Sequence, residues 1–232
     1  MNKVLSLREQ PILSLRKNPI LSPPITVATV EAEMDARPHL AGDRACRTRE
    51  VNRTMRDARQ IKTAAAAIGA LPGPTEAIHM AISGTWALFH VIGAALEMAH
   101  PARIEELTIA TLSFSRRNIE SLCALVDAGK INAVSLLCSH YFKNTTPDLY
   151  TLAETEFAKR PDRARFLSIR THAKILAVRL TDGRTATCES SANVRSSKNC
   201  EQLSIFGDPQ LYAFHRGWIA ELFDAAGGRG VK

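Results

Sequence analysis

The sequence predicts an α/β fold whose sheet is mostly parallel and flanked by helices, preceded by a basic tail that is partly helical or disordered. From Thr75 onward, short β-prone runs alternate with helix-prone segments, and strands separated by helices form right-handed βαβ units with parallel strands. Just before, Pro72-Gly73-Pro74 ends a helix-favouring run, as proline and glycine often do. We therefore expect a tail or linker over 1–75, a folded domain over 76–226 and a flexible C-terminus over 227–232.

Hydrophobic periodicity and capping residues predict the elements of this domain in order. They are a largely helical segment over 77–98, a strand over 107–112, an amphipathic helix over 115–128 capped by Ser115, a strand over 131–138, a helix over 148–159, a run over 165–169 that leads into the next strand, two strands around Asp182-Gly183, a strand over 203–206 and a helix over 209–223. Asp-Gly between two β-prone runs is the strongest short-range signal for a hairpin.

Composition limits the class of protein. With 232 residues, of which 45% are hydrophobic, the chain can bury one substantial core. The longest apolar candidate, 86–98, carries His90 and Glu97 and is shorter than the roughly 20 residues that span a bilayer. Early prolines argue against a secretory signal, and five cysteines without a C-x-x-C pair predict reduced thiols and no zinc site. We expect a cytoplasmic protein without membrane insertion.

The formal net charge of +7 favours a polyanionic partner. Basic residues crowd the end of the predicted tail, and spacings of three and four would align four of them on one face of a helix: Arg49, Arg53, Arg56 and Arg59. Such a face could follow the phosphates of a nucleic acid. A solvated helix or a linker without a partner is the alternative.

Two basic side chains precede the hairpin. His172 and Lys174 are two residues apart and would share one face of a strand. The hairpin would then return Ser191 and Asn193 to a position beside them. This pattern resembles half of the active site of the phospholipase D superfamily, whose signature is H-x-K-x4-D followed by G-S-x-N and a later glutamate. His172, Lys174, Ser191, Asn193 and Glu201 occupy the matching places.

The chain departs from that signature at two positions. Arg179 stands where the family has aspartate, and Ser190 stands where it has the glycine of G-S-x-N. Asp182 cannot replace the missing aspartate, because it falls in the predicted turn. A solvated strand edge followed by an ordinary polar turn is the alternative interpretation of the same residues.

The resemblance is to short members with a single motif, which are nuclease-like, and it implies a homodimer with the active site on a two-fold axis. It implies that His172 of one subunit attacks phosphorus, while His172 of the other protonates the leaving oxygen and then activates water. Lys174 and Asn193 would bind the non-bridging oxygens, Ser191 would bind phosphate or its neighbours, and Glu201 would orient the imidazole. Neither metal nor cofactor is needed. Arg195 and Lys198 either extend the basic surface or are ordinary solvated charges.

These observations favour a metal-independent phosphodiesterase that acts on nucleic acid through a phosphohistidine. Two alternatives stay open. One is a catalytically weak or inactive nucleic-acid-binding protein that keeps the scaffold, which Arg179 and Ser190 would explain. The other is a hydrolase of a phospholipid or another small phosphodiester.

Overall fold

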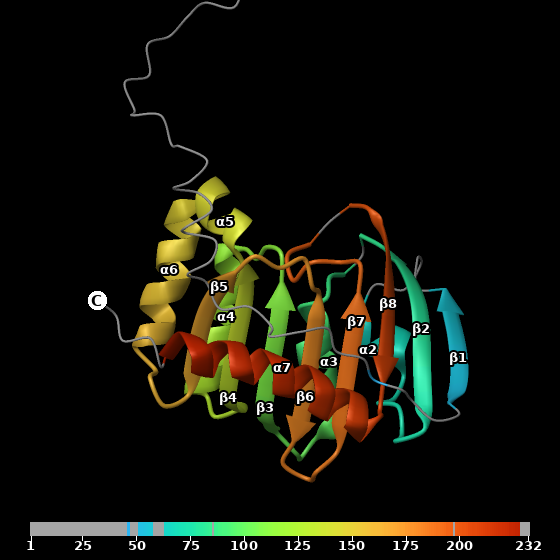
Figure 1. Ribbon diagram of the computed structural model, residues 1–232. Coiled ribbons are helices and arrows are strands. Elements are labelled where there is room, and N and C mark those ends of the chain that lie inside the picture. The colour runs from blue at the N-terminus through green and yellow to red at the C-terminus, as the bar shows by residue number, and fades with distance from the viewer. Residues whose placement is uncertain (1–45, 47–50, 58–62, 85, 197, 228–232) are drawn as a thin grey trace, which may run out of the picture. The chain divides into compact units, whose positions relative to one another are not determined.

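A computed structural model describes residues 46, 51–57, 63–84, 86–196 and 198–227 of the protein. These residues form one eight-stranded sheet in the order β1-β2-β8-β7-β6-β3-β4-β5, with helices on both faces (Figure 1). The strands are β1 Asn52–Asp57, β2 Glu76–Ser83, β3 Ile104–Thr111, β4 Ile131–Ser139, β5 Ala164–Ile169, β6 Ile175–Leu180, β7 Thr185–Ser190 and β8 Cys200–Phe206. The helices are α2 Ala64–Ile68, α3 His90–Ala99, α4 Arg116–Asp127, α5 His140–Thr145, α6 Pro147–Ala158 and α7 Pro209–Gly227.

The sheet is mixed, so the expectation of a mostly parallel sheet was wrong. The pairs β1–β2, β3–β4 and β4–β5 are parallel, whereas β2–β8, β8–β7, β7–β6 and β6–β3 are antiparallel. The reason is the hairpin after β6, where Gly183 adopts a φ of 87° that favours glycine. The chain then turns again into β8, and this meander is inserted between the two parallel parts of the sheet.

Most elements lie where the sequence placed them, including a helix over 116–127 with Ser115 as its N-cap. The segment 77–98 differs from the expected helix, because its first part is strand β2 and only its second part is helix α3. Alanine, methionine and isoleucine alternate there with little polar contrast, so the helical and strand periods are hard to separate. Its partners β1 and β8 supply the hydrogen bonds that decide the outcome.

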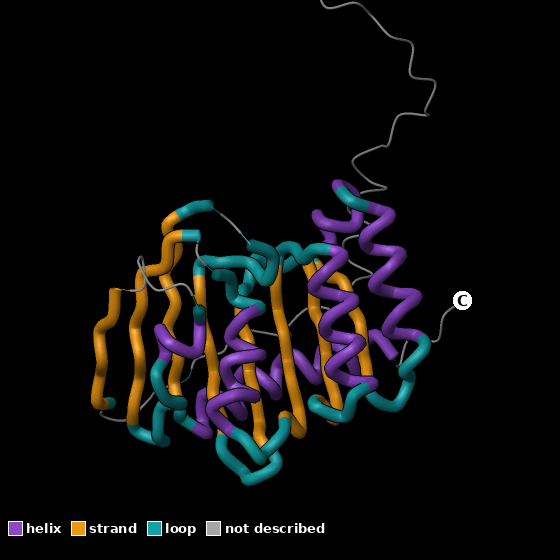
Figure 2. The backbone as a smooth tube through the Cα atoms, turned by 180° about the vertical axis from the view of Figure 1, so that it is seen from behind, coloured by secondary structure: helices purple, strands orange, loops and turns teal. Residues whose placement is uncertain are grey.

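Helices cover the two faces of the sheet separately. Helix α7 crosses one face in Figure 1, and Figure 2 shows the helices of the opposite face. Beneath α7, Trp218 and Leu222 pack with Ala110 and Ile175. The larger core lies on the other face, where α2, α3, α4 and α6 bury aliphatic and aromatic residues of the strands. Among the described residues, no helix is long and apolar enough to cross a membrane.

The folded part begins before the boundary that we expected at residue 75. Strand β1 pairs with β2, and Ile68 of α2 is fully buried in the larger core. Pro72-Gly73-Pro74 is thus a connection between α2 and β2. It approaches the end of β8 so closely that a Cβ on Gly207 would lie 2.1 Å from the carbonyl oxygen of Gly73.

The five cysteines fall into two groups. Burial raises the pKa of Cys123, Cys138 and Cys188, in the case of Cys138 to about 12. Cys200 is exposed and Cys46 is half-buried. Since the thiolate is the reactive form, Cys46 and Cys200 should react with an aromatic disulfide reagent at neutral pH, and the other three only after unfolding in guanidinium. Mass spectrometry of the labelled peptides checks this, and native labelling of Cys188 as fast as that of Cys200 would contradict it.

Candidate active site

One edge of the sheet gathers the polar residues that the motif singled out. The C-terminal ends of β2, β3, β4, β5 and β7 meet the N-terminal ends of β6 and β8 there, as the pairs Ala110–Ile175, Ser139–Ile169 and Ser190–Leu203 show. It is the upper edge in Figure 1. In open α/β sheets ligands usually bind outside the carboxyl ends of the strands.

His172 and Lys174 lie in the connection from β5 to β6, just before β6 begins, rather than on the strand itself. The two side chains are in contact. The Lys174 Nζ lies 2.8 Å from His172 Nδ1 and also donates to the His172 carbonyl oxygen at 3.0 Å. The imidazole is exposed, whereas the lysine is half-buried. A cation and an imidazole are therefore held together with the ring open to solvent.

Glu201 stands within electrostatic reach of this pair. Partial burial lowers the pKa of Lys174, and the Glu201 carboxylate opposes this by raising the pKa. A backbone hydrogen bond also joins the end of β7 to this pair, since Ser190 N–H donates to the Lys174 carbonyl oxygen at 3.1 Å. Lys174 thus lies beside the end of β7, within electrostatic reach of Glu201 at the beginning of β8.

Ser191 holds Glu201. The Ser191 hydroxyl donates to Glu201 Oε2 and accepts from the backbone N–H of Gln202 at 3.0 Å. In the part of the chain that the structure describes, no hydrogen bond joins Glu201 to His172. The carboxylate is therefore positioned by the serine, and its link to the histidine passes through Lys174.

Asn193 is anchored to the end of β3. Its Oδ1 accepts from the backbone N–H of Leu112 at 3.2 Å, which fixes which end of the amide is oxygen. The next residue reinforces the anchor, because Val194 N–H donates to the Thr111 hydroxyl at 3.2 Å. With the oxygen engaged, the Nδ2 group of Asn193 presents two N–H donors for another acceptor.

The two departures from the family signature have structural roles here. The Ser190 hydroxyl donates to the Gln202 carbonyl oxygen at 2.7 Å and accepts from Ala192 N–H at 2.9 Å, so it stabilises the turn after β7. Arg179 lies at the other end of β6, where it pairs with Glu105 at 3.2 Å and Glu106 at 3.4 Å. Four residues of strand, about 13 Å, separate it from Ile175. It takes no part in the site.

The basic residues proposed for nucleic acid are arranged differently than we expected. Arg53 and Arg56 lie in β1, which is a strand and not the helix that we expected. Arg49 and Arg59 lie outside the described residues. Arg195 and Lys198 are exposed in the loop between β7 and β8, the same loop that holds Ser191 and Asn193.

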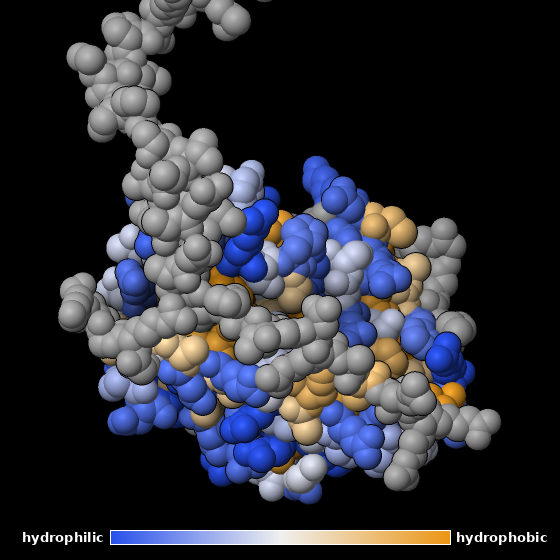
Figure 3. Space-filling view, in the orientation of Figure 1, coloured by the Kyte–Doolittle hydropathy of each residue, from blue (hydrophilic) through white to orange (hydrophobic). Residues whose placement is uncertain are grey.

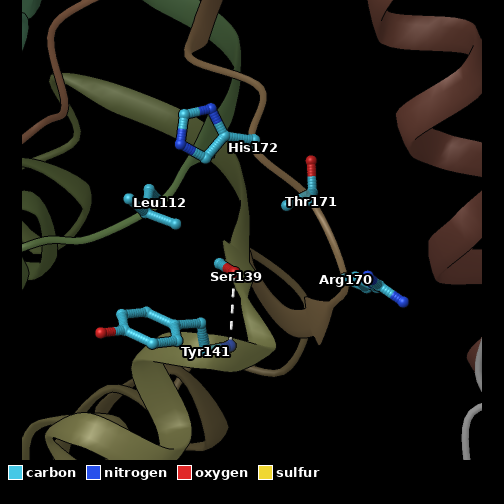
Figure 4. A pocket seen from close by; sticks show the side chains of 6 residues that line it. All are labelled: Leu112, Ser139, Tyr141, Arg170, Thr171 and His172. Carbon is cyan, nitrogen blue, oxygen red and sulfur yellow. Dashed lines mark hydrogen bonds between the residues drawn. The ribbon is translucent and has the colours of Figure 1, made fainter.

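An open hollow of about 510 Å³ lies beside His172 (Figure 4). Its other lining residues come from the ends of three strands: Leu112, Ser139, Tyr141, Arg170 and Thr171. The sequence analysis did not predict it, although residues 139–141 lie at the end of β4, at the edge where open α/β sheets usually bind ligands. No group of three or more histidine, cysteine or acidic side chains with metal-binding geometry occurs within the described ranges.

Comparison with known proteins assigns the chain to no family. No protein-family model matches the chain, and no curated protein sequence matches it. Among solved structures, the crystal structure of polyphosphate kinase from Porphyromonas gingivalis is similar, with 12% sequence identity and a TM-score of 0.48. The match covers 72% of this chain and 29% of that one, so the chain spans less than a third of the kinase.

Proposed function

We propose that the protein is a phosphodiesterase of the phospholipase D type that acts on nucleic acid without a metal ion. The observation that carries this proposal is the contact between His172 and Lys174 at a sheet edge that also holds Ser191, Asn193 and Glu201. A nucleophile, a cation and an amide donor at one edge are the groups that an anionic phosphodiester requires.

The proposed reaction has two steps. A lone pair of the His172 imidazole attacks phosphorus and forms an N–P bond, while the bond from phosphorus to the leaving oxygen breaks and a second imidazole donates its proton to that oxygen. Water then loses a proton to the second imidazole and attacks phosphorus, which breaks the N–P bond. Lys174 and Asn193 donate to the non-bridging oxygens in both steps.

The observed hydrogen bond suggests how substrate prepares the nucleophile. While the Lys174 ammonium donates to Nδ1, that nitrogen's lone pair is occupied and the ring proton is on Nε2. A phosphate anion competes for the ammonium and so releases the imidazole. Because the ring is exposed, its tautomers exchange freely with solvent. Lys174 then stabilises the phosphoryl charge instead of the resting histidine.

The second imidazole comes from a second copy of the chain. Each copy contributes one motif, and two exposed His172 rings can face each other across a two-fold axis. The assembly is therefore a homodimer with one active site. Glu201 acts on its own His172 through Lys174, and Ser191 keeps the carboxylate in place.

Nucleic acid is the proposed substrate because of charge. The net charge of +7 and the exposed Arg195 and Lys198 in the loop that holds Asn193 favour a polyanion over a single headgroup. Arg49, Arg53, Arg56 and Arg59 add sequence-independent phosphate contacts in this proposal. The test is hydrolysis of DNA, RNA and phosphatidylcholine in the presence of EDTA. Cleavage of nucleic acid that survives chelation supports the proposal, and exclusive cleavage of the lipid would contradict it.

An inactive nucleic-acid-binding protein is the second candidate. The observation that favours it is the bond of Glu201 to Ser191, which leaves the carboxylate without a direct hold on His172 among the described residues. Binding of nucleic acid without turnover, under conditions in which the protein is folded and dimeric, would select this candidate.

The pH profile of activity should depend on Glu201. Lys174 must be charged to bind phosphate. Burial lowers the pKa of Lys174, and the Glu201 carboxylate opposes this by raising the pKa. Removing the carboxylate in Glu201→Gln lowers that pKa further, so the alkaline fall of kcat/KM should move to lower pH. The matched control is Glu120→Gln on the exposed face of α4, which should leave the profile unchanged. An alkaline limb that stays in place or moves to higher pH in Glu201→Gln would contradict the coupling.

A further inference from the structure

Tyr141 stands out from every other large apolar residue that the structure describes. It is 65% exposed, and it is the one exposed large hydrophobic residue among them. Figure 3 shows the face of the molecule on which α7 lies. Where described residues form its surface, apolar and hydrophilic residues are mixed. An aromatic ring left in water contributes nothing to the core, and its face is open to a ligand.

The backbone beneath this ring is well fixed. Tyr141 N–H donates to the Ser139 hydroxyl at 3.3 Å, which caps the short helix α5. The neighbouring Phe142 is buried, and its ring centroid lies 4.4 Å from that of Phe114. The backbone of Tyr141 is therefore held in place by its neighbours. Within the described part of the chain, the Tyr141 ring contacts no other ring.

The ring and His172 border the same hollow. Figure 4 shows the side chain of Leu112 between the two rings, with Ser139 and Thr171 to the right of it. The side chain of Arg170 points away from both rings. Two apolar walls and the polar residues Ser139 and Thr171 thus border a space of about 510 Å³, within the range of about 300–1,000 Å³ typical of small-ligand sites.

We infer that Tyr141 is a stacking platform for an unpaired base, next to a phosphate bound by His172 and Lys174. The inference rests on the proposed function, because that function places the phosphate. A base offers a flat apolar face to Tyr141 and Leu112 and a polar edge to the hydroxyls of Ser139 and Thr171. The substrate it selects is single-stranded nucleic acid, since the bases of a duplex are already stacked on one another.

An acyl chain fits the same hollow less well. It would require an extended apolar groove, whereas this hollow is bordered by Ser139, Thr171 and one exposed aromatic ring. Stacking on an aromatic side chain also tolerates any base, because every base has a π-face. The site therefore confers preference for strandedness and not for sequence.

The test is equilibrium binding of fluorescent oligonucleotides, measured by anisotropy at one salt concentration. Tyr141→Ala should weaken binding of a single strand by about 5- to 150-fold, the range that loss of one base–aromatic stack produces. Tyr141→Phe should bind within about twofold of the wild type, because the ring is kept. Asn144→Ala, an exposed residue on the same helix, is the matched control and should bind as the wild type does.

Duplex and abasic strands separate stacking from charge. Their binding should be unchanged in Tyr141→Ala, since neither presents an unpaired base. Equal loss on all three ligands, no loss on the single strand, or a loss confined to phosphatidylcholine vesicles would overturn the inference. Strands that bind through Tyr141 but are never cleaved would overturn the proposed phosphodiesterase and leave the stacking site standing. If Tyr141→Ala cleaves single strands with an unchanged KM, the stacking site is overturned and the proposed phosphodiesterase stands.

Discussion

Replacing His172 by alanine should reduce hydrolysis of every phosphodiester substrate by about 10³-fold or more, because in the proposed mechanism the imidazole forms the covalent bond to phosphorus. The fold should be unaffected. The ring is exposed, and the hydrogen bonds described for the side chain are those with Lys174. Equal melting temperatures of the variant and the wild type, measured by circular dichroism, would show that the loss is chemical.

His90→Ala is the matched control. His90 is another exposed imidazole, placed at the start of α3, where its Nδ1 accepts from Ala87 N–H at 2.9 Å. Its removal should leave turnover within a factor of about two, since surface substitutions away from a site usually have small effects. The wild type should stay active in EDTA. Full activity of His172→Ala, or abolition of wild-type activity by the chelator, would remove the proposed mechanism.

Local signals in the sequence predicted individual elements well. The helix over 116–127 begins at a capping box, in which Ser115 and Asn118 satisfy each other's backbone groups, and such a signal needs no distant partner. The hairpin at Asp182-Gly183 is local in the same sense. The order of the strands is not local. It depends on β8 pairing with β2, more than a hundred residues earlier, and no periodicity encodes that choice.

The same distinction applies to the site. Spacing alone places His172 close to Lys174, and the hairpin carries Ser191 and Asn193 to the edge where β6 begins. The hydrogen-bond partners of these side chains could not be predicted from the motif. Leu112, which anchors Asn193, directly follows β3, and the motif contains no information about it. The exposure of Tyr141 was not predicted, because exposure depends on the folded structure. An aromatic residue in an apolar segment is typical of a core position.

Mixing active and inactive subunits should abolish activity in every mixed dimer. One chain supplies one His172, and hydrolysis through a phosphohistidine needs a second imidazole to protonate the leaving oxygen. If wild type and His172→Ala exchange subunits freely at equal amounts, about half of the dimers are mixed. Activity per total protein should then be about one quarter of the wild-type value, whereas independent subunits would give about one half.

Heterodimers purified through two different affinity tags give the sharper measurement, because they contain no wild-type dimer. They should have less than about a hundredth of the wild-type turnover, while heterodimers of wild type with His90→Ala should be fully active. Sedimentation velocity at assay concentration should show a dimer. An active monomer would contradict the shared site. The second imidazole would then have to come from the same chain, and His140 is the residue to replace next, since it follows β4 at the same edge and its Nδ1 lies 3.3 Å from the Ser168 hydroxyl.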